Sequence, residues 1–281
     1  ASSNPYTQSI LIFSEGSKEV FVQDFIRLES QYRFPLLTLN LGQDVQLFNG
    51  TDFNSTTGPG FLSNGANVDV AGRTQVDVYR THLGGNYSLT GKTFLSGAVD
   101  YTVADYGPLI SWETLQGNLF VNYTYSPKLV IGIGGSVGYD WVDSPNPAQT
   151  FEQANLRMTY EATGKISLYL SGGVEFRQFE GDSRGTYVSP VYELGVTYQP
   201  FDGTTISLRG NSRVLNSAVL AGQDFVPSNI ILGVRQRLLR RIFVGVTAGY
   251  EYANYFSTVP GVTATREDNY YFIQPGIDIT V

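Results

Sequence analysis

The feature that most constrains the fold is a regular alternation of side-chain character, clearest between Lys128 and Val142. After the lysine the segment reads LVIGIGGSVGYDWV, in which every second residue from Leu129 to Trp141 is apolar or glycine. The residues between them are mostly glycine, serine or aspartate. A period of two gives an extended strand one apolar face and one small or polar face, whereas a helix would scatter both kinds of residue around its axis. The segment is therefore predicted to be a β-strand between two different environments.

The same alternation recurs along the chain and predicts twelve strands. They are expected at 34–47, 74–89, 93–105, 112–126, 128–142, 150–162, 165–179, 187–199, 204–214, 226–239, 242–255 and 268–281. Their connections alternate in length. Short turns containing Gly, Pro or Asp, such as 163–164 and 200–203, alternate with longer segments rich in Asn, Ser, Thr, Asp, Gly and Pro, such as 215–225 and 256–267. Short turns at one end and long loops at the other are typical of outer-membrane barrels.

Membrane insertion then dictates the architecture. The sequence has no apolar run of about 18 residues, so a transmembrane helix is not expected. Inside a bilayer every backbone N–H and C=O must be paired, so a spanning sheet closes on itself. We predict an all-β fold: a closed antiparallel transmembrane up-and-down β-barrel of about twelve strands in the bacterial outer membrane. Short periplasmic turns, longer extracellular loops and periplasmic chain ends are expected. The chain starts at Ala1, as after removal of a signal peptide.

The predicted barrel comprises residues 34–281. Residues 1–33 alternate less regularly, and Val20–Val22 and Phe25–Leu28 suggest only a short strand or an amphipathic turn. This segment is expected to lie in the periplasm, to plug the lumen, or to pack on a partner; the sequence leaves these alternatives open.

Charged residues in the middle of the predicted strands fall on the polar face, which lines the lumen. An arginine facing lipid at the bilayer midplane would cost about 2–4 kcal/mol. The residues predicted to line the pore are Arg80, Arg157, Arg177, Arg209, Arg213, Arg235, Arg237, Asp100, Glu175, Glu193, Glu251 and Asp278.

Two interpretations of these lumen charges remain open. The arginines gather on strands 150–162, 165–179, 204–214 and 226–239, opposite a more acidic arc, and such a transverse field would orient polar solutes. Alternatively, the groups form ion pairs that fill a closed lumen, as Glu175 beside Arg177 suggests.

Aromatic residues on the apolar face lie near the predicted strand ends. Two belts at the membrane interfaces are therefore expected, although aromatic residues are also generally common in strands. The candidates are Tyr87, Tyr125, Tyr160 and Tyr198 near the short turns, and Tyr139 and Trp141 near the long loops.

Several other functions are disfavoured by the residues present. The chain has no Cys and one His, His82, so disulfides and Cys-based metal sites are excluded and a His-based metal site is not expected. No nucleophile motif accompanies His82, and no helix or Lys-Ser/Thr pair follows the glycines at 132–135, so neither catalysis nor a phosphate loop is expected. A net charge of −7 argues against a nucleic-acid partner. The chain is expected to have no cofactor.

Four stretches resemble the β-barrel porin 2 family of bacterial outer-membrane β-barrel proteins: ATGKISLYLSGGVEFRQF (162–179), YQPFDGTTISL (198–208), NSAVLAGQDF (216–225) and QRLLRRIFVGVTAGYE (236–251). The resemblance covers about 75–281. It implies a Gram-negative outer-membrane barrel, in some members encoded near exopolysaccharide genes, and carries no catalytic residues. The final residues, 274–281, also resemble the C-terminal signal of the barrel-assembly machinery, except that the last residue is Val281 rather than Phe.

Three functions are compatible with this sequence. The first is a porin-like passive channel for small polar solutes, surrounded by outer-membrane lipid and either monomeric or homo-oligomeric. The second is a structural or anchoring barrel with a plugged lumen, bound to a surface layer, an exopolysaccharide system or a partner protein. The third is a soluble β-sandwich or solenoid, in which the apolar faces would pack against a second layer of protein.

Overall fold

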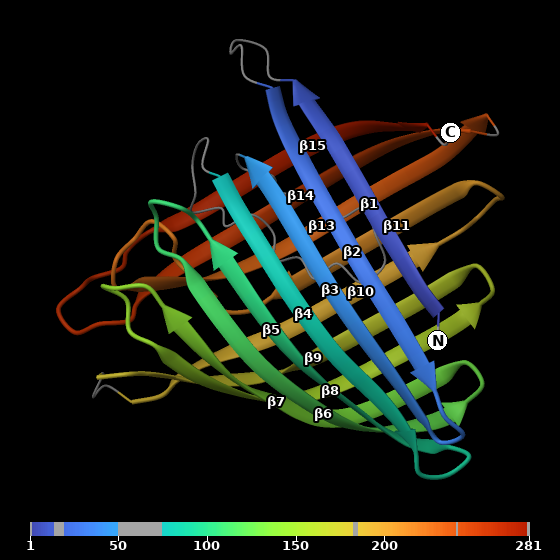
Figure 1. Cartoon of the computed structure of the whole chain (residues 1–281), viewed down its shortest axis with the longest axis horizontal. Helices are drawn as coiled ribbons and strands as arrows, with labels where there is room; N and C mark the ends of the chain where they lie inside the picture. The colour runs from blue at the N-terminus through green and yellow to red at the C-terminus, as the bar shows by residue number, and fades with distance from the viewer. Residues whose placement is uncertain (1, 14–19, 50–74, 182–184, 240, 280–281) are drawn as a thin grey trace.

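The computed structural model describes residues 2–13, 20–49, 75–181, 185–239 and 241–279. These form one large antiparallel sheet that curls around an interior (Figure 1). The strands are β1 (Ser2–Phe13), β2 (Val20–Arg33), β3 (Leu37–Asn49), β4 (Gln75–Ser88), β5 (Thr93–Asp105), β6 (Trp112–Ser126), β7 (Leu129–Val142), β8 (Gln149–Thr163), β9 (Ile166–Phe179), β10 (Tyr187–Tyr198), β11 (Thr204–Ser212), β12 (Leu215–Asn216), β13 (Gln223–Leu239), β14 (Ile242–Ser257) and β15 (Glu267–Ile279).

Each strand pairs with its neighbours in chain order, so the topology is up-and-down. The order runs from β1 to β11 and continues through β13, β14 and β15, while the two-residue β12 pairs with β13 beside this path. All twelve predicted strands are present as β3 to β11 and β13 to β15. The strand count of about twelve is too low, because residues 1–33, expected in the periplasm or as a plug, supply β1 and β2 to the sheet.

Closure of the barrel differs from the prediction. Among the described residues no pairing joins β1 to β15, so the sheet keeps two edges. Both edge strands contain a proline, Pro5 and Pro275. Proline has no amide hydrogen to donate to a ladder and is typical of edge strands.

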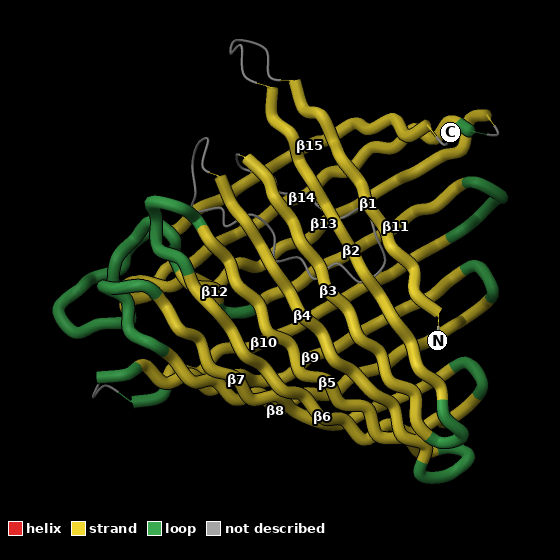
Figure 2. Tube along the Cα trace, in the orientation of Figure 1, coloured by secondary structure: helices red, strands yellow, loops and turns green. Residues whose placement is uncertain are grey.

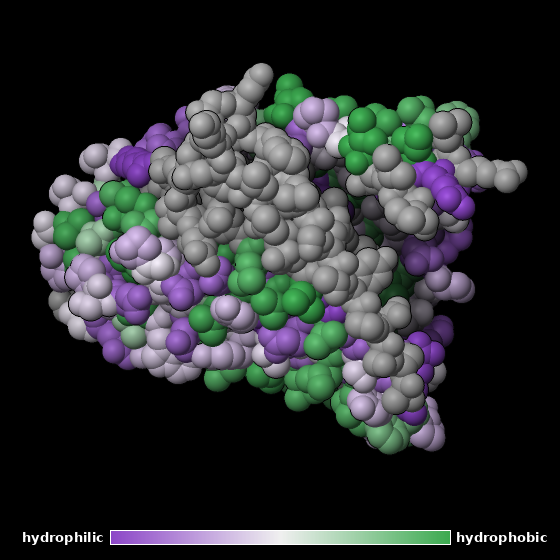
Figure 3. All heavy atoms as spheres, turned by 45° about the horizontal axis from the view of Figure 1, so that its top comes forward, coloured by the Kyte–Doolittle hydropathy of each residue, from purple (hydrophilic) through white to green (hydrophobic). Residues whose placement is uncertain are grey.

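The two ends of the sheet differ as expected (Figure 2). Short turns such as 126–129 and 163–166 lie at one end, together with the start of β1 and the end of β15 (Figure 1). The longer described connections, such as 106–111 and 143–148, lie at the other end, where Figure 3 shows many hydrophilic residues. In the described part of the chain, no helix is long and apolar enough to cross a membrane.

The two faces of the strands have the predicted environments. Val121, Ile133 and Leu156 point outward and are 46%, 62% and 63% exposed, in register with one another across β6, β7 and β8. The alternate residues Asn122, Ser136 and Glu175 point inward and are buried. No second layer of described residues covers the outer apolar side chains, which disfavours a sandwich. The outward face therefore offers an apolar surface to lipid.

Glycines on the inner face of β7 allow large neighbouring side chains to lie flat against the wall. A Cβ atom on Gly134 would come within 2.2 Å of the Leu119 carbonyl oxygen and 2.6 Å of the Phe120 ring. A Cβ atom on Gly138 would come within 2.2 Å of the Phe151 ring. Because these positions lack side chains, Phe120 and Phe151 pack across β7 rather than projecting into the lumen.

Substitution of Gly134 tests this packing. We expect Gly134→Ala to lower the free energy of unfolding by about 1–3 kcal/mol, because the added methyl group would overlap backbone and ring atoms. Unfolding by urea in lipid vesicles, followed by tryptophan fluorescence, measures the change. Gly117→Ala is the matched control on the adjacent strand, since its Cβ would meet nothing within 4 Å. Equal stability of the two variants would contradict the packing role of Gly134.

Candidate functional site

The candidate site is built around a chain segment that folds into the lumen. This inward segment, Arg213–Gly222, connects β11 to β13 at the long-loop end. Asn216, Ser217 and Ala218 in it are buried. The Ser217 hydroxyl accepts the backbone N–H of Leu220 at 2.8 Å and fixes a tight turn. Gly222 ends the segment with a φ of 71°, a conformation that favours glycine.

The inward segment is held by the wall formed by β4 and β5. Ala218 joins an apolar cluster with Val76, Val78, Ala104 and Tyr106. Its carbonyl oxygen also accepts the backbone N–H of Ile110 at 2.9 Å.

A second attachment binds the same segment to β8. The Gln149 side-chain amide donates to Asn216 Oδ1 at 2.8 Å and to Asp224 Oδ2 at 2.7 Å. Since Ala218 contacts β4 and β5 while Asn216 contacts β8, the inward segment crosses the lumen.

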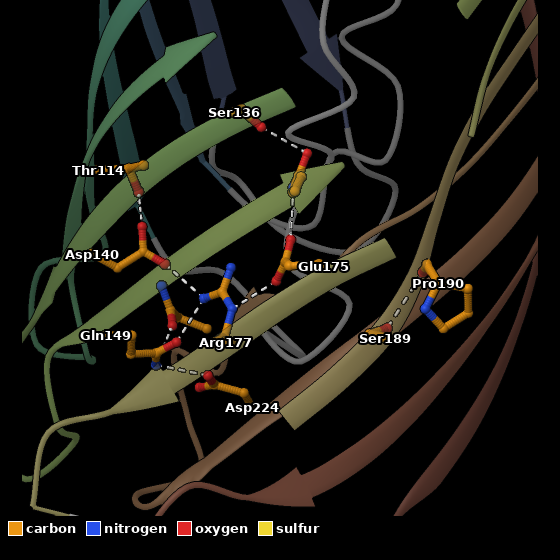
Figure 4. A network of polar contacts seen from close by, with 11 residues as sticks. Thr114, Ser136, Asp140, Gln149, Glu175, Arg177, Ser189, Pro190 and Asp224 are labelled. Atoms are coloured by element: carbon orange, nitrogen blue, oxygen red, sulfur yellow. Dashed lines mark hydrogen bonds and ion pairs between the residues drawn. The ribbon is translucent and has the colours of Figure 1, made fainter. Parts of the chain in front are cut away.

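A buried arginine cluster lies where the inward segment meets β7, β8 and β9 (Figure 4). Arg177 Nε donates to Glu175 Oε1 at 2.8 Å, and Arg177 Nη1 donates to Asp140 Oδ2 at 2.7 Å and to Gln149 Oε1 at 2.6 Å. The guanidinium carbon lies 4.8 Å from the centre of the Phe151 ring. Arg177, Asp140 and Glu175 are only 3%, 3% and 1% exposed, so one cation bridges two carboxylates away from bulk water.

Neutral side chains complete the hydrogen bonding of the two carboxylates. Thr114 donates to Asp140 Oδ1 at 2.6 Å. Gln153 donates to Glu175 Oε2 at 2.7 Å and accepts from Ser136 at 3.0 Å. Figure 4 shows this network extending across the inner face of the sheet. The satisfied network fixes Arg177 in one position.

A polar cavity of about 100 Å³ lies between this cluster and the inward segment. Arg213 is one of the residues that line this cavity. Burial lowers its pKa, and the carboxylate of Glu193 acts in the opposite direction. The arginine stays protonated at neutral pH. The lining residues include Arg80, Asp100, Asp140, Glu175, Arg177 and Arg213.

Two further ion pairs line the lumen on β2 to β5. Arg80 Nη2 lies 2.6 Å from Asp100 Oδ1, and His82 Nδ1 lies 2.8 Å from the same oxygen. Arg27 Nε lies 2.7 Å from Asp44 Oδ1. These pairs and the Arg177 cluster agree with the interpretation in which the lumen charges pair. They also neutralise several carboxylates of the acidic arc expected in the alternative interpretation.

The remaining predicted pore-lining residues are distributed along the interior. Arg157 contacts Asn122, Ser96 and the Phe120 ring. Arg209 lies opposite Gly195, and Arg235 lies over the Phe243 ring at 4.0 Å. Glu251 is within 3.4 Å of Asn229 Nδ2. Arg237 on β13 is in register with Phe243 on β14. Asp278 belongs to β15, but its side chain is not among those that the structure describes.

The predicted interface aromatics occupy the outer face. Tyr87, Tyr125, Tyr160 and Tyr198 are exposed near the short turns, at the ends of β4, β6, β8 and β10. Tyr139 and Trp141 pack together on β7 near the long loops, with ring centres 4.7 Å apart, and Tyr139 donates to Glu180 at 2.7 Å.

Three elements of the site escape sequence reasoning. Arg27 was missed because β2 was not assigned to the barrel, although 26–33 alternates regularly. Gln149 was placed in a loop, one residue before the predicted strand. Residues 215–222 of the inward segment fall in a predicted long loop, whose composition carries no signal for the direction in which it folds.

Comparison with known proteins gives matches only at the level of structure. No protein-family model and no curated protein matches the sequence. Similar solved structures include the FrpB iron transporter from Neisseria meningitidis, F3-3 variant (10% identity, TM-score 0.55, 99% of this chain and 55% of that chain). The F5-1 variant is also similar (10%, 0.52, 93% and 51%). A third is OmpT, an outer membrane protein of Vibrio cholerae (12%, 0.48, 99% and 95%).

The chain spans about half the length of the two FrpB variants. At 10% identity the likeness concerns the fold. Together with the up-and-down strand order and the outward apolar band, it defines the class: a β-barrel of the outer-membrane type. The protein is accordingly localised in the bacterial outer membrane.

Proposed function

We propose that the protein is a porin-like passive channel for small polar solutes, with the inward segment Arg213–Gly222 as its constriction. The observation that carries this proposal is that a charged, hydrogen-bonded zone of the lumen coincides with the segment that folds inward between β11 and β13. A polar lining of this kind selects hydrated solutes by size and charge.

The size of the barrel supports the proposal. Eight-stranded barrels are filled by their own side chains, whereas barrels of 16–18 strands enclose an aqueous channel. A path of fourteen strands lies between these limits. Such a lumen is wider than those of eight-stranded barrels, and a segment folded into it narrows it.

Conductance in planar lipid bilayers tests this function. We expect discrete single-channel currents from the purified protein, and larger ones when residues 214–221 are replaced by a Gly-Ser linker of equal length, because the constriction would widen. The same replacement of 180–186 is the control and should leave the conductance unchanged. A protein that inserts but never conducts, with or without the inward segment, would contradict the channel.

A second candidate is the anchoring barrel with a plugged lumen. It is favoured by the close packing of the inward segment in the lumen, where Ser217 and Ala218 have no exposed surface. This candidate predicts that the intact protein does not conduct and that the linker variant does. Its partner would be a surface layer, an exopolysaccharide system or another protein.

The remaining parts of the proposal concern chemistry and family. We propose that the protein is not an enzyme and uses no cofactor. Membership of the β-barrel porin 2 family is proposed from the stretches at 162–179 and 198–208. Outer-membrane lipid is the proposed surrounding, either around one copy or around a homo-oligomer, with no role for nucleic acid.

A further inference from the structure

Arg157 lies across the inner wall in an unusual way. It belongs to β8, but its side chain passes over β7 and reaches β6 and β5. Nε and Nη2 donate to Asn122 Oδ1 at 2.9 and 2.7 Å, and Nη2 also donates to Ser96 Oγ. The crossing depends on Gly132, which faces both Asn122 and Arg157 in the register. A Cβ atom there would lie 2.4 Å from Asn122 Oδ1 and 3.1 Å from Arg157 Cγ.

The partners that hold Arg157 are neutral. Arg177, Arg80 and Arg27 each form an ion pair with a carboxylate. No described carboxylate forms one with Arg157, whose contacts are an amide oxygen, a hydroxyl and the Phe120 ring at 4.0 Å. Arg157 therefore keeps a net positive charge on the inner wall.

One edge of this guanidinium remains open to the lumen. Nη1 donates no hydrogen bond to the described residues, and it is not among their buried unpartnered side-chain atoms. Asn122 and Ser96 accept hydrogen bonds from Nε and Nη2, and the guanidinium carbon lies over the Phe120 ring. The side chain is thus held in place, with Nη1 accessible from the lumen.

We propose that Arg157, positioned by Gly132, Asn122 and Ser96, is a binding site for the carboxylate group of solutes in the lumen. A guanidinium matches a carboxylate in shape and charge, and a preorganised one loses little side-chain entropy on binding. This inference rests on the proposed function, since the solute must enter the lumen. It adds the chemical class of solute: small organic acids bind at this level, whereas neutral sugars do not.

The test compares gluconate with glucose, a neutral solute of similar size. With the wild-type protein in planar bilayers, we expect gluconate to reduce the chloride current saturably and glucose to have no such effect. Arg157→Gln should raise the apparent Kd for gluconate about tenfold or more, the ratio expected for loss of a charged hydrogen bond. Arg157→Lys keeps the charge but not the planar guanidinium with its parallel N–H donors. Compared with Arg157→Gln, it should recover chloride selectivity without recovering the affinity for gluconate.

Arg235→Gln is the matched control, because Arg235 also lies 4.0 Å from an aromatic ring in the lumen and loses the same charge. It should leave the Kd for gluconate unchanged. Calorimetric titration of gluconate into the protein in detergent separates the two proposals, because binding there does not require conduction. Binding lost only in Arg157→Gln supports the site even if no channel conducts. Absence of gluconate binding to the wild type, or equal binding by Arg157→Gln, overturns the site and leaves a conducting channel intact.

Discussion

Replacement of Arg177 by methionine is expected to lower the free energy of unfolding by about 3–5 kcal/mol, because it removes the cation between two buried carboxylates. Asp140 and Glu175, which are 3% and 1% exposed, would then lose the cation that pairs with both of them. A typical protein is stable by only about 5–15 kcal/mol, so the loss would be a large part of the total. Urea unfolding in lipid vesicles, followed by the fluorescence of Trp112 and Trp141, measures it.

Two comparisons isolate the buried charges as the cause. Arg235→Met removes an exposed lumen arginine of similar size and should change stability by less than about 1 kcal/mol. Adding Asp140→Asn and Glu175→Gln to Arg177→Met removes the uncompensated charges and should recover much of the loss, since a whole buried network can often be neutralised at little cost. If the triple variant were as unstable as Arg177→Met alone, loss of packing against Phe151 would explain the effect instead.

The positions of the strands were predictable because alternation is a local property of the sequence. The strand at Leu129–Val142 could be placed from its own residues, and its inner and outer faces follow from the period of two. The N-terminal strands were harder to assign. β1, SSNPYTQSILIF, contains Pro5 and has polar residues at both odd and even positions. Its inner and outer faces therefore could not be identified without the partner strand β2.

The partners of the charged residues were not predictable in the same way. The period of two assigns Arg177 to the lumen, but the register between strands decides which side chains share its level. Arg177 is opposite Phe151 on β8, and it reaches Asp140 on β7 diagonally across that strand. The inward segment adds contacts between residues far apart in the sequence, such as Gln149 with Asn216. No local pattern encodes such contacts, so an array of separate pore charges and a paired cluster look alike in the sequence.

The assignment of the outer face to lipid makes the second large prediction. Leu119 lies in the middle of β6, points outward and is 59% exposed, whereas its neighbour Asn118 points inward opposite Ser136. Leu119→Arg is expected to lower the free energy of unfolding by about 2–4 kcal/mol in a bilayer, because the charge enters the hydrocarbon layer. Asn118→Arg adds the same charge on the water-filled side and should cost less than about 1 kcal/mol.

The comparison is decisive because the two variants share strand, depth, net charge and added side chain. Refolding into lipid vesicles, scored by the slower gel migration of unheated folded barrel, gives the inserted fraction, and urea titration gives the free energy. Leu119→Arg should insert poorly and Asn118→Arg should insert like the wild type. Equal stabilities in the bilayer would mean that Leu119 is not in contact with lipid, and the constriction, the channel and the carboxylate site would all lose their common basis, which is an interior enclosed by the opposite face of the same strands.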